Sequence, residues 1–355
     1  AAAAGGVTSI MDMPNTNPLT VTLDALNAKL DLLNEKCIVN HSCYFGATNN
    51  NYTEFDKLDK HRVCGIKLFM GSSTGNMLVD KMNSLLNIFN GTDMLIAAHC
   101  EDQETIKNNI EKYKQKYKGA DDIPVSAHPS IRSVPACYAS SELAVRLAKI
   151  AGARLHILHV STAKELQLFS DEPLANKNIT AEACVAHLLF TLTHYNSLGA
   201  RIKCNPAVKR KTDREALRTA VNSGLIDVIA TDHAPHLLSE KEGGALKAMS
   251  GMPMIQFSLV SMLELVDEGV FSLETVVQKM CHAPARIYGI CQRGYIREGY
   301  QADLVLVRPN SPWEVTTDKI LSKCGWSPLE GHTFNWKVEK TFANGHLIYN
   351  GNTVN

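Results

Sequence analysis

The fold is decided by the stretch Leu225-Ile-Asp-Val-Ile-Ala-Thr-Asp-His-Ala-Pro-His236. Its apolar, β-branched first half is typical of a buried strand, and this strand ends in Asp232, His233 and His236. In a barrel of parallel strands, that end carries the catalytic side chains. An isolated Asp-His pair is more often a helix cap beside surface histidines. Here a functional interpretation is favoured, because other strands of the chain end in the same way.

Short apolar runs alternate with longer amphipathic stretches along most of the chain, as expected for strand–helix units and a parallel sheet. Helices are expected between most of the strands, at 19–34, 136–151 and 213–223, the last with Asp213 as its N-cap. The expected strands are 7–13, 37–45, 64–70, 94–99, 154–159, 179–183 and 225–231. We therefore predict an α/β fold, a TIM-type (β/α)8 barrel whose first strand is missing from this sequence. The opening alanines look like a helix end, so we expect residues to precede them.

The sequence changes character after about residue 290. Residues 294–307 and 336–349 alternate apolar and polar side chains, and Asn344-Gly345 in the second run is a strong hairpin signal. We predict two parts, an enzyme barrel over 1–290 and a small β-sandwich portion over 291–355 that packs on the barrel.

Composition excludes several classes of function. Lys plus Arg and Asp plus Glu each number 36, so no basic surplus indicates nucleic acid. No apolar run reaches the roughly 20 residues that a membrane helix needs. The ten cysteines are scattered without a C-x-x-C pair, which is typical of reduced core residues. We expect a cytoplasmic protein that binds neither nucleic acid nor membrane.

Chemically reactive side chains stand near the ends of four expected strands. Lys67 lies within G-I-K-L-F-M, His99 ends A-A-H, His159 ends H-I-L-H, and Asp232 ends I-A-T-D. Singly, a strand lysine usually extends to solvent and a strand histidine is usually a core residue. Their conjunction on one face of a barrel favours a site. His156 lies deeper in its strand and is better interpreted as a packed core histidine.

Two imidazoles and a carboxylate are usual ligands of zinc. An ammonium group buried beside a metal would be costly. If Lys67 reacts with carbon dioxide, it becomes an anionic carbamate whose two oxygens could bridge two metals about 3.5–4 Å apart. Glu182, at the end of another strand, is a candidate to support a ligand. The roles of His128 and His187 stay open. Asn15, in the turn after the first strand, offers an amide to an anionic substrate group.

These motifs resemble those of the dihydroorotases of the amidohydrolase superfamily, class I-like. The segments M-D-M-P-N-T-N-P, G-I-K-L-F-M, A-H-C-E, H-I-L-H-V-S-T, A-E-A-C and A-T-D-H-A-P-H occur here in that family's order, over nearly the whole chain. The pairing of P-N-T-N-P with T-D-H-A-P-H is specific, since hydantoinases, dihydropyrimidinases and allantoinases usually vary both.

The resemblance implies reversible, zinc-dependent cyclisation of N-carbamoyl-L-aspartate to L-dihydroorotate in pyrimidine biosynthesis. It implies that Lys67 is the carboxylated bridge between two zinc ions, and that His99 and His159 hold the second zinc. Asp232 would bind the first zinc and carry the proton. Asn15 and His236 would hold the substrate carboxylate, and His233 would support the site from behind.

Three departures from the family's pattern bear on this expectation. The H-x-H pair that holds the first zinc, and the arginine after it, are missing, so we expect that zinc to be weak or absent and this fragment to be inactive. Val134-Pro135 stands where an acidic residue is expected after I-R-S, and Met254 stands where relatives tend to have Gly.

Two alternatives and several partners remain open. The chain could be another cyclic amidase, acting on a hydantoin, dihydropyrimidine or allantoin. It could also be a non-catalytic dihydroorotase-like scaffold for aspartate transcarbamoylase, although a scaffold has no chemical need for Lys67, His99, His159 and Asp232. The expected partners are the small-molecule substrate, a second copy of the chain in a homodimer, and aspartate transcarbamoylase.

Overall fold

A computed structural model describes residues 1–71 and 77–355. Seven parallel strands form one curved sheet in which the spatial order follows the chain order. All seven predicted strands are present; they are β1 Ser9–Asp12, β2 Asn40–Gly46, β3 Val63–Met70, β4 Ile96–Cys100, β5 Leu155–Ile157, β6 Ile179–Cys184 and β7 Val228–Ala230. The central strands are mostly apolar because both of their faces are buried. Within the described residues, β1 and β7 each have a strand neighbour on one side only.

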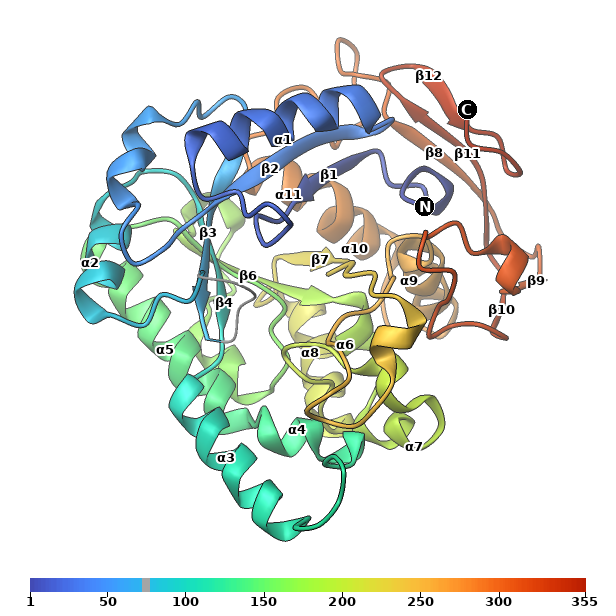
Figure 1. The fold of residues 1–355 in the computed structure, drawn as a ribbon. Helices are drawn as coiled ribbons and strands as arrows, with labels where there is room; N and C mark the ends of the chain where they lie inside the picture. Colours follow the sequence, from blue (N-terminus) through green and yellow to red (C-terminus); the bar gives the residue numbers. More distant parts are fainter. Residues whose placement is uncertain (72–76) are drawn as a thin grey trace.

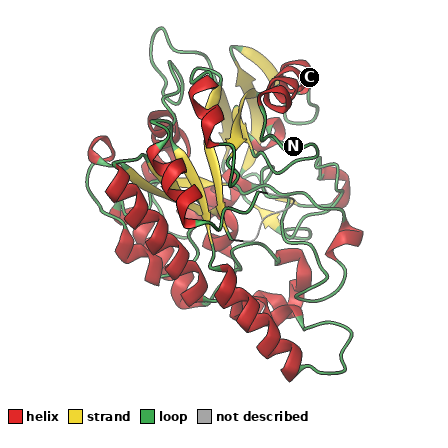
Figure 2. Cartoon of the chain, turned by 60° about the vertical axis from the view of Figure 1, so that its left-hand side comes forward, coloured by secondary structure: helices red, strands yellow, loops and turns green. Residues whose placement is uncertain are grey.

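Helices follow most strands and cover the outside of the sheet (Figures 1 and 2). Each strand and the helix after it form one unit of a TIM-type barrel. The helices, apart from short 3-10 and π turns, are α1 Leu23–Lys36, α2 Met82–Asn90, α3 Gln103–Lys116, α4 His128–Ile131, α5 Val134–Ala151, α6 Val185–Leu189, α7 Tyr195–Leu198, α8 Lys211–Ser223, α9 Ser258–Asp267, α10 Leu273–Val277 and α11 Ala283–Ile287.

Two helix starts differ from the sequence expectation. Asp213 is not the N-cap of α8, because the helix begins earlier, at Lys211. Its carboxylate instead accepts the backbone N–H of Arg210 at 3.2 Å and that of Ala163 at 3.0 Å. Helix α5 begins at Val134, with Pro135 in its first turn. Proline is favoured there because that N–H has no partner within the helix, so the Val-Pro pair begins this helix without an acidic residue.

Two small antiparallel sheets follow the barrel. Strands β8 (Leu304–Arg308), β11 (Lys337–Ala343) and β12 (His346–Tyr349) form one, and β9 (Trp313–Glu314) and β10 (Thr333–Phe334) form the other. The predicted hairpin is confirmed: Asn344 and Gly345 connect β11 to β12, with φ of 52° and 80°. Both values are positive, as a two-residue type I′ turn requires. Thr341 in β11 donates to the Ala3 carbonyl at 2.7 Å, which places this sheet against the N-terminal segment (Figure 1).

The structure places no helix among the described residues that is long and apolar enough to cross a membrane.

Candidate active site

The four predicted strand-end residues lie at the same end of the barrel. Lys67 is within β3 and His99 within β4, while His159 and Asp232 come two residues after β5 and β7. Parallel strands deliver their carboxyl ends to one mouth, which explains how residues 165 positions apart meet. Lys67, His99 and His159 are buried, with exposed fractions of 2%, 4% and 5%. Asp232 remains accessible to solvent.

His99 and His159 face each other directly. Nδ1 of His99 lies 3.0 Å from Nε2 of His159, and the ring centroids are 4.8 Å apart at 76°. The other nitrogen of His99, Nε2, lies 3.0 Å from a carboxylate oxygen of Glu101. Nδ1 of His159 is buried without a hydrogen-bond partner among the described atoms. Burial lowers the pKa of both histidines, so both rings are neutral and able to offer a nitrogen lone pair.

Backbone strain marks two of the four positions. His159 and Asp232 have φ of 39° and 44°, in the left-handed region that residues other than glycine seldom adopt. Such conformations persist where surrounding contacts enforce them, and they concentrate at functional sites. At His159 one such contact is visible, since its backbone N–H donates to Oε1 of Glu182 at 3.2 Å. Glu182, a candidate supporting residue, thus contacts the backbone of the predicted ligand His159.

Lys67 and Asp232 influence each other's protonation. Burial lowers the pKa of Lys67 to about 8, although Asp232 and Glu182 oppose the shift. Although part of Asp232 reaches solvent, the protein atoms around it desolvate its carboxyl group and raise its pKa to about 6; the charge of Glu182 adds to this while Lys67 opposes it. A lysine with this pKa has a substantial neutral fraction near neutral pH, and only the neutral amine can react with carbon dioxide. A carboxyl group with a pKa near 6 can both accept and donate a proton.

The residues fit a metal ion in part. Zinc binds histidine nitrogens at about 2.0–2.1 Å. Nδ1 of His99 and Nε2 of His159 could therefore bind one ion between them if the distance between these atoms increased slightly. The carboxylate of Glu101 behind His99 is the usual second partner of a zinc-bound imidazole. For another ion the chain offers Lys67 and Asp232. Within residues 1–71 and 77–355 no cluster combines three or more His, Cys, Asp or Glu groups in metal-binding geometry. The donors therefore fit one histidine-bound ion, and a second only once Lys67 carries a carbamate.

The predicted substrate-binding residues lie on loops. Asn15 is exposed in the turn after β1. His236 is partly buried, and its Nδ1 lies 3.6 Å from the Glu240 carboxylate. His233 turns into the scaffold, where its Nδ1 accepts the backbone N–H of Ile255 at 3.2 Å. This contact agrees with a supporting role for His233. The structure therefore brings His236 and His233 into defined surroundings, whereas no hydrogen bond fixes the Asn15 side chain within the described residues.

Three other histidines are buried and hydrogen-bonded to the scaffold. His156 is fully buried, and its ring nitrogens contact Thr180 at 2.8 Å and Glu182 at 3.1 Å, which agrees with a packed core histidine. His128 and His187 hold the segment 204–206, since their Nε2 atoms each lie 2.9 Å from a backbone carbonyl, of Cys204 and Pro206 respectively.

Sequence reasoning missed the pair Glu101 and Arg132. Glu101 is fully buried, and Arg132 donates from Nη1 to the same oxygen that faces His99. The guanidinium and His99 hold the pKa of Glu101 at about 2, against the opposing effect of burial. The acidic residue in A-H-C-E was a visible signal, since it stands two residues after a predicted ligand. Nothing in the sequence linked it to Arg132.

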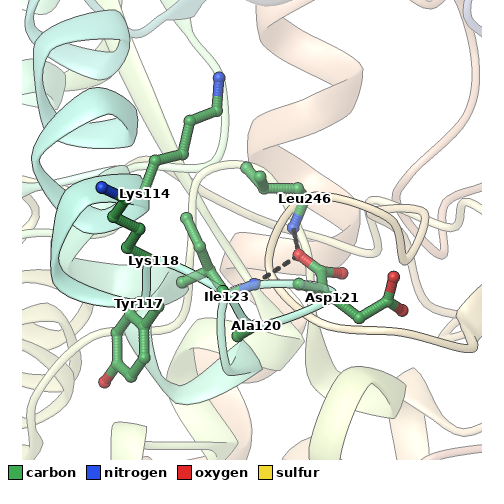
Figure 3. Close-up of a pocket in the computed structure, with 9 residues that line it drawn as sticks. Lys114, Tyr117, Lys118, Ala120, Asp121, Ile123 and Leu246 are labelled. Carbon is green, nitrogen blue, oxygen red and sulfur yellow. Dashed lines mark hydrogen bonds between the residues drawn. The ribbon is translucent and has the colours of Figure 1, made fainter.

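Figure 3 shows a different hollow, on the outer end of α3 and the loop after it. There Oδ1 of Asp122 accepts the backbone N–H of Ile123 at 2.7 Å and that of Leu246 at 3.1 Å. Its described lining includes none of the predicted catalytic or metal-binding residues. This hollow is therefore separate from the barrel mouth.

Comparison with known proteins gives consistent matches. The sequence model of the Amidohydrolase family matches residues 1–348. A dihydroorotase of Halobacterium salinarum is 32% identical over 99% of this chain and 80% of its own length. An allantoinase of Bacillus velezensis is 30% identical over 98% of this chain and 77% of its own. The solved L-hydantoinase of Arthrobacter aurescens superimposes with a TM-score of 0.93 at 28% identity, covering 100% of this chain and 80% of that one.

Proposed function

Because the chain belongs to the amidohydrolase family, we propose that it is a dihydroorotase, which interconverts N-carbamoyl-L-aspartate and L-dihydroorotate in pyrimidine biosynthesis. The observation that carries the proposal is the His99–His159 pair beside Lys67 and Asp232 at one barrel mouth. Relatives named dihydroorotase at about 30% identity support the substrate. The motifs P-N-T-N-P and T-D-H-A-P-H support it independently.

We propose two zinc ions as cofactors. Lys67, as a carbamate, would bridge them; His99 and His159 would hold one ion and Asp232 the other. Bound zinc would polarise the ring amide carbonyl and lower the pKa of the attacking water. With only Lys67 and Asp232 in this sequence for its ion, that zinc is expected to bind the more weakly.

Residues of the chain would carry out proton transfer and substrate binding. In ring opening, a bond forms between the water oxygen and the amide carbon while the carbon–nitrogen bond breaks. Asp232 takes the proton from the water and delivers it to the departing nitrogen. Asn15 and His236 hold the substrate carboxylate. Cyclisation is the reverse sequence.

The test compares the metal-loaded protein, expressed with any residues that its gene encodes before Ala1, on three rings: L-dihydroorotate, dihydrouracil and allantoin. We expect dihydroorotate to be opened with the highest kcat/KM, because its carboxylate meets Asn15 and His236. Preference for an uncharged ring would reject the proposal in favour of another cyclic amidase. The allantoinase and hydantoinase relatives make that class the second candidate.

Metal analysis separates catalysis from a scaffold role. Zinc bound in proportion to protein, with activity lost on chelation, supports the proposal. A protein without bound zinc that associates with aspartate transcarbamoylase would support the scaffold alternative. The same preparation, run by size-exclusion chromatography with light scattering, tests the proposed homodimer.

A further inference from the structure

Lys241 is a buried lysine in the loop that follows the barrel mouth, and burial lowers its pKa to about 7. Its exposed fraction is 5%, and its Nζ donates to the carbonyls of Lys203 at 3.0 Å, Met249 at 2.6 Å and Gly251 at 2.7 Å. Within the described chain no carboxylate forms an ion pair with it. An ammonium has three donors, and three carbonyls satisfy all of them. Burying an ammonium group costs free energy. We therefore infer that Lys241 has a role in the structure other than placing a charge on the surface.

Gly251 lies between Lys241 and His236: its carbonyl accepts a hydrogen bond from Lys241, and the His236 ring is close to its backbone. A Cβ at Gly251 would lie 2.6 Å from the Ala234 carbonyl oxygen and 2.8 Å from Cδ2 of His236. The imidazole ring therefore lies so close to the Gly251 backbone that no side chain would fit between them. The N–H of Gly251 donates to the Lys203 carbonyl at 2.8 Å. The Lys203 carbonyl therefore accepts hydrogen bonds from both the Gly251 N–H and the Lys241 Nζ. Lys241 thus fixes the segment against which the His236 ring packs.

Other contacts of His236 belong to the same group. Nε1 of Trp326 donates to the His236 carbonyl at 2.8 Å, and Lys241 Nζ lies 5.9 Å from the centre of the Trp326 ring. The Glu240 carboxylate, next to Lys241 in sequence, lies 3.6 Å from His236 Nδ1 and accepts the Leu237 N–H at 2.7 Å. The backbone and ring of His236 are therefore in contact with Trp326, which lies beside Lys241, and with Glu240, the sequence neighbour of Lys241.

We propose that Lys241 is a positioning residue for His236, and that its three carbonyl bonds set where the imidazole meets an anionic substrate carboxylate. The proposal rests on the proposed function, in which His236 binds that carboxylate. It adds a determinant of substrate affinity that does not itself touch the substrate. Lys241 should therefore affect KM for charged rings and leave the chemical step nearly unchanged.

Truncation and chemical rescue test this role. Lys241→Ala removes the atoms that n-propylammonium contains. We expect KM for L-dihydroorotate to rise about tenfold, roughly one hydrogen bond's worth of binding energy, with kcat within about threefold. Added n-propylammonium should restore KM, and tetramethylammonium, which has no donor, should not. The matched control is Lys247→Ala in the same loop, an exposed lysine paired with Asp121 at 2.5 Å.

A second measurement is independent of activity. In protein labelled with 5-fluorotryptophan, Lys241→Met should shift the fluorine resonance of Trp326 and leave those of Trp313 and Trp336 in place. If the wild type does not open dihydroorotate, the proposed function fails, while this shift still tests the positioning. An unmoved Trp326 resonance in a folded variant, an unchanged KM in Lys241→Ala, or no recovery with n-propylammonium would overturn the inference.

Discussion

Glu101 controls which nitrogen of His99 is free. Its carboxylate can only accept a hydrogen bond, because Arg132 and His99 hold its pKa at about 2. His99 must therefore carry its proton on Nε2, which faces Glu101 at 3.0 Å. Nδ1 then presents a lone pair toward His159. The ring is thus held in the tautomer that a metal ion at this position requires.

Glu101→Gln should weaken zinc binding, because an amide can donate as well as accept and no longer selects the tautomer. We expect affinity to fall roughly 10- to 100-fold, the usual cost of losing an outer partner of a zinc-bound histidine. Competition with a chromogenic chelator measures it. Glu104→Gln on the exposed side of α3 is the matched control. Equal zinc affinity in Glu101→Gln and wild type would show that Arg132 and Glu101 serve stability alone.

The buried neutral histidines should make the protein sensitive to acid. Burial lowers the pKa of His187 to about 4, and those of His128 and His159 also fall. The unfolded chain, with histidine pKa near 6.5, then binds more protons than the folded one as pH drops. Stability is therefore full above about pH 6.5 and declines as the pH falls toward 4.

His187→Gln tests this contribution. By linkage, the lowered pKa of His187 alone should reduce the free energy of unfolding by about 2 kcal/mol when the pH falls from 7 to 5. Gln can still donate to the Pro206 carbonyl but does not titrate. Urea unfolding at the two pH values should show a smaller loss for this variant than for wild type. The exposed His61→Gln serves as control, and an unchanged pH dependence in His187→Gln would contradict the assignment.

At the scale of elements, Asp213 in the first turn of α8 joins two segments of the chain. Its carboxylate accepts N–H groups from Arg210, just before α8, and from Ala163, after β5. The sequence predicted a cap near this position from residue type. It could not predict the second partner, because that partner is a backbone group and carries no residue-type signal.

Asp213→Ala should lower the free energy of unfolding by about 2 kcal/mol, since two partly buried N–H groups lose a charged acceptor. Asp213→Asn should cost less, because the amide oxygen still accepts. Urea unfolding at pH 7 measures both. Thr212→Ala, at the exposed neighbouring position, is expected to change stability by less than about 0.5 kcal/mol. A loss in Asp213→Ala no larger than in Thr212→Ala would argue against the bridging role.

For the whole molecule, the sequence predicted the barrel because its strands depend on short-range patterns, and the same patterns placed the candidate site residues near strand ends. Apolar runs of strand length gave all seven strands, and reactive residues at their ends gave Lys67, His99, His159 and Asp232. Contacts between distant loops were not predictable. Arg132 reaches Glu101 from 31 residues away, and Lys241 binds only carbonyls, which every residue has. Such contacts form only when the barrel has folded, and no periodic pattern in the sequence predicts them.

Zinc should stabilise the whole fold, because its proposed ligands stand on separate strands that unfolding separates. Binding to the folded state alone adds about 2.7 kcal/mol at a metal concentration 100 times Kd. Thermal unfolding at pH 7.5 should therefore shift upward with zinc and return on chelation. His159→Ala should abolish most of the shift, since it removes one of the two facing nitrogens, whereas His61→Ala on the surface should not. An equal shift in both variants would place the zinc elsewhere, and a shift with magnesium would indicate an oxygen-rich site instead.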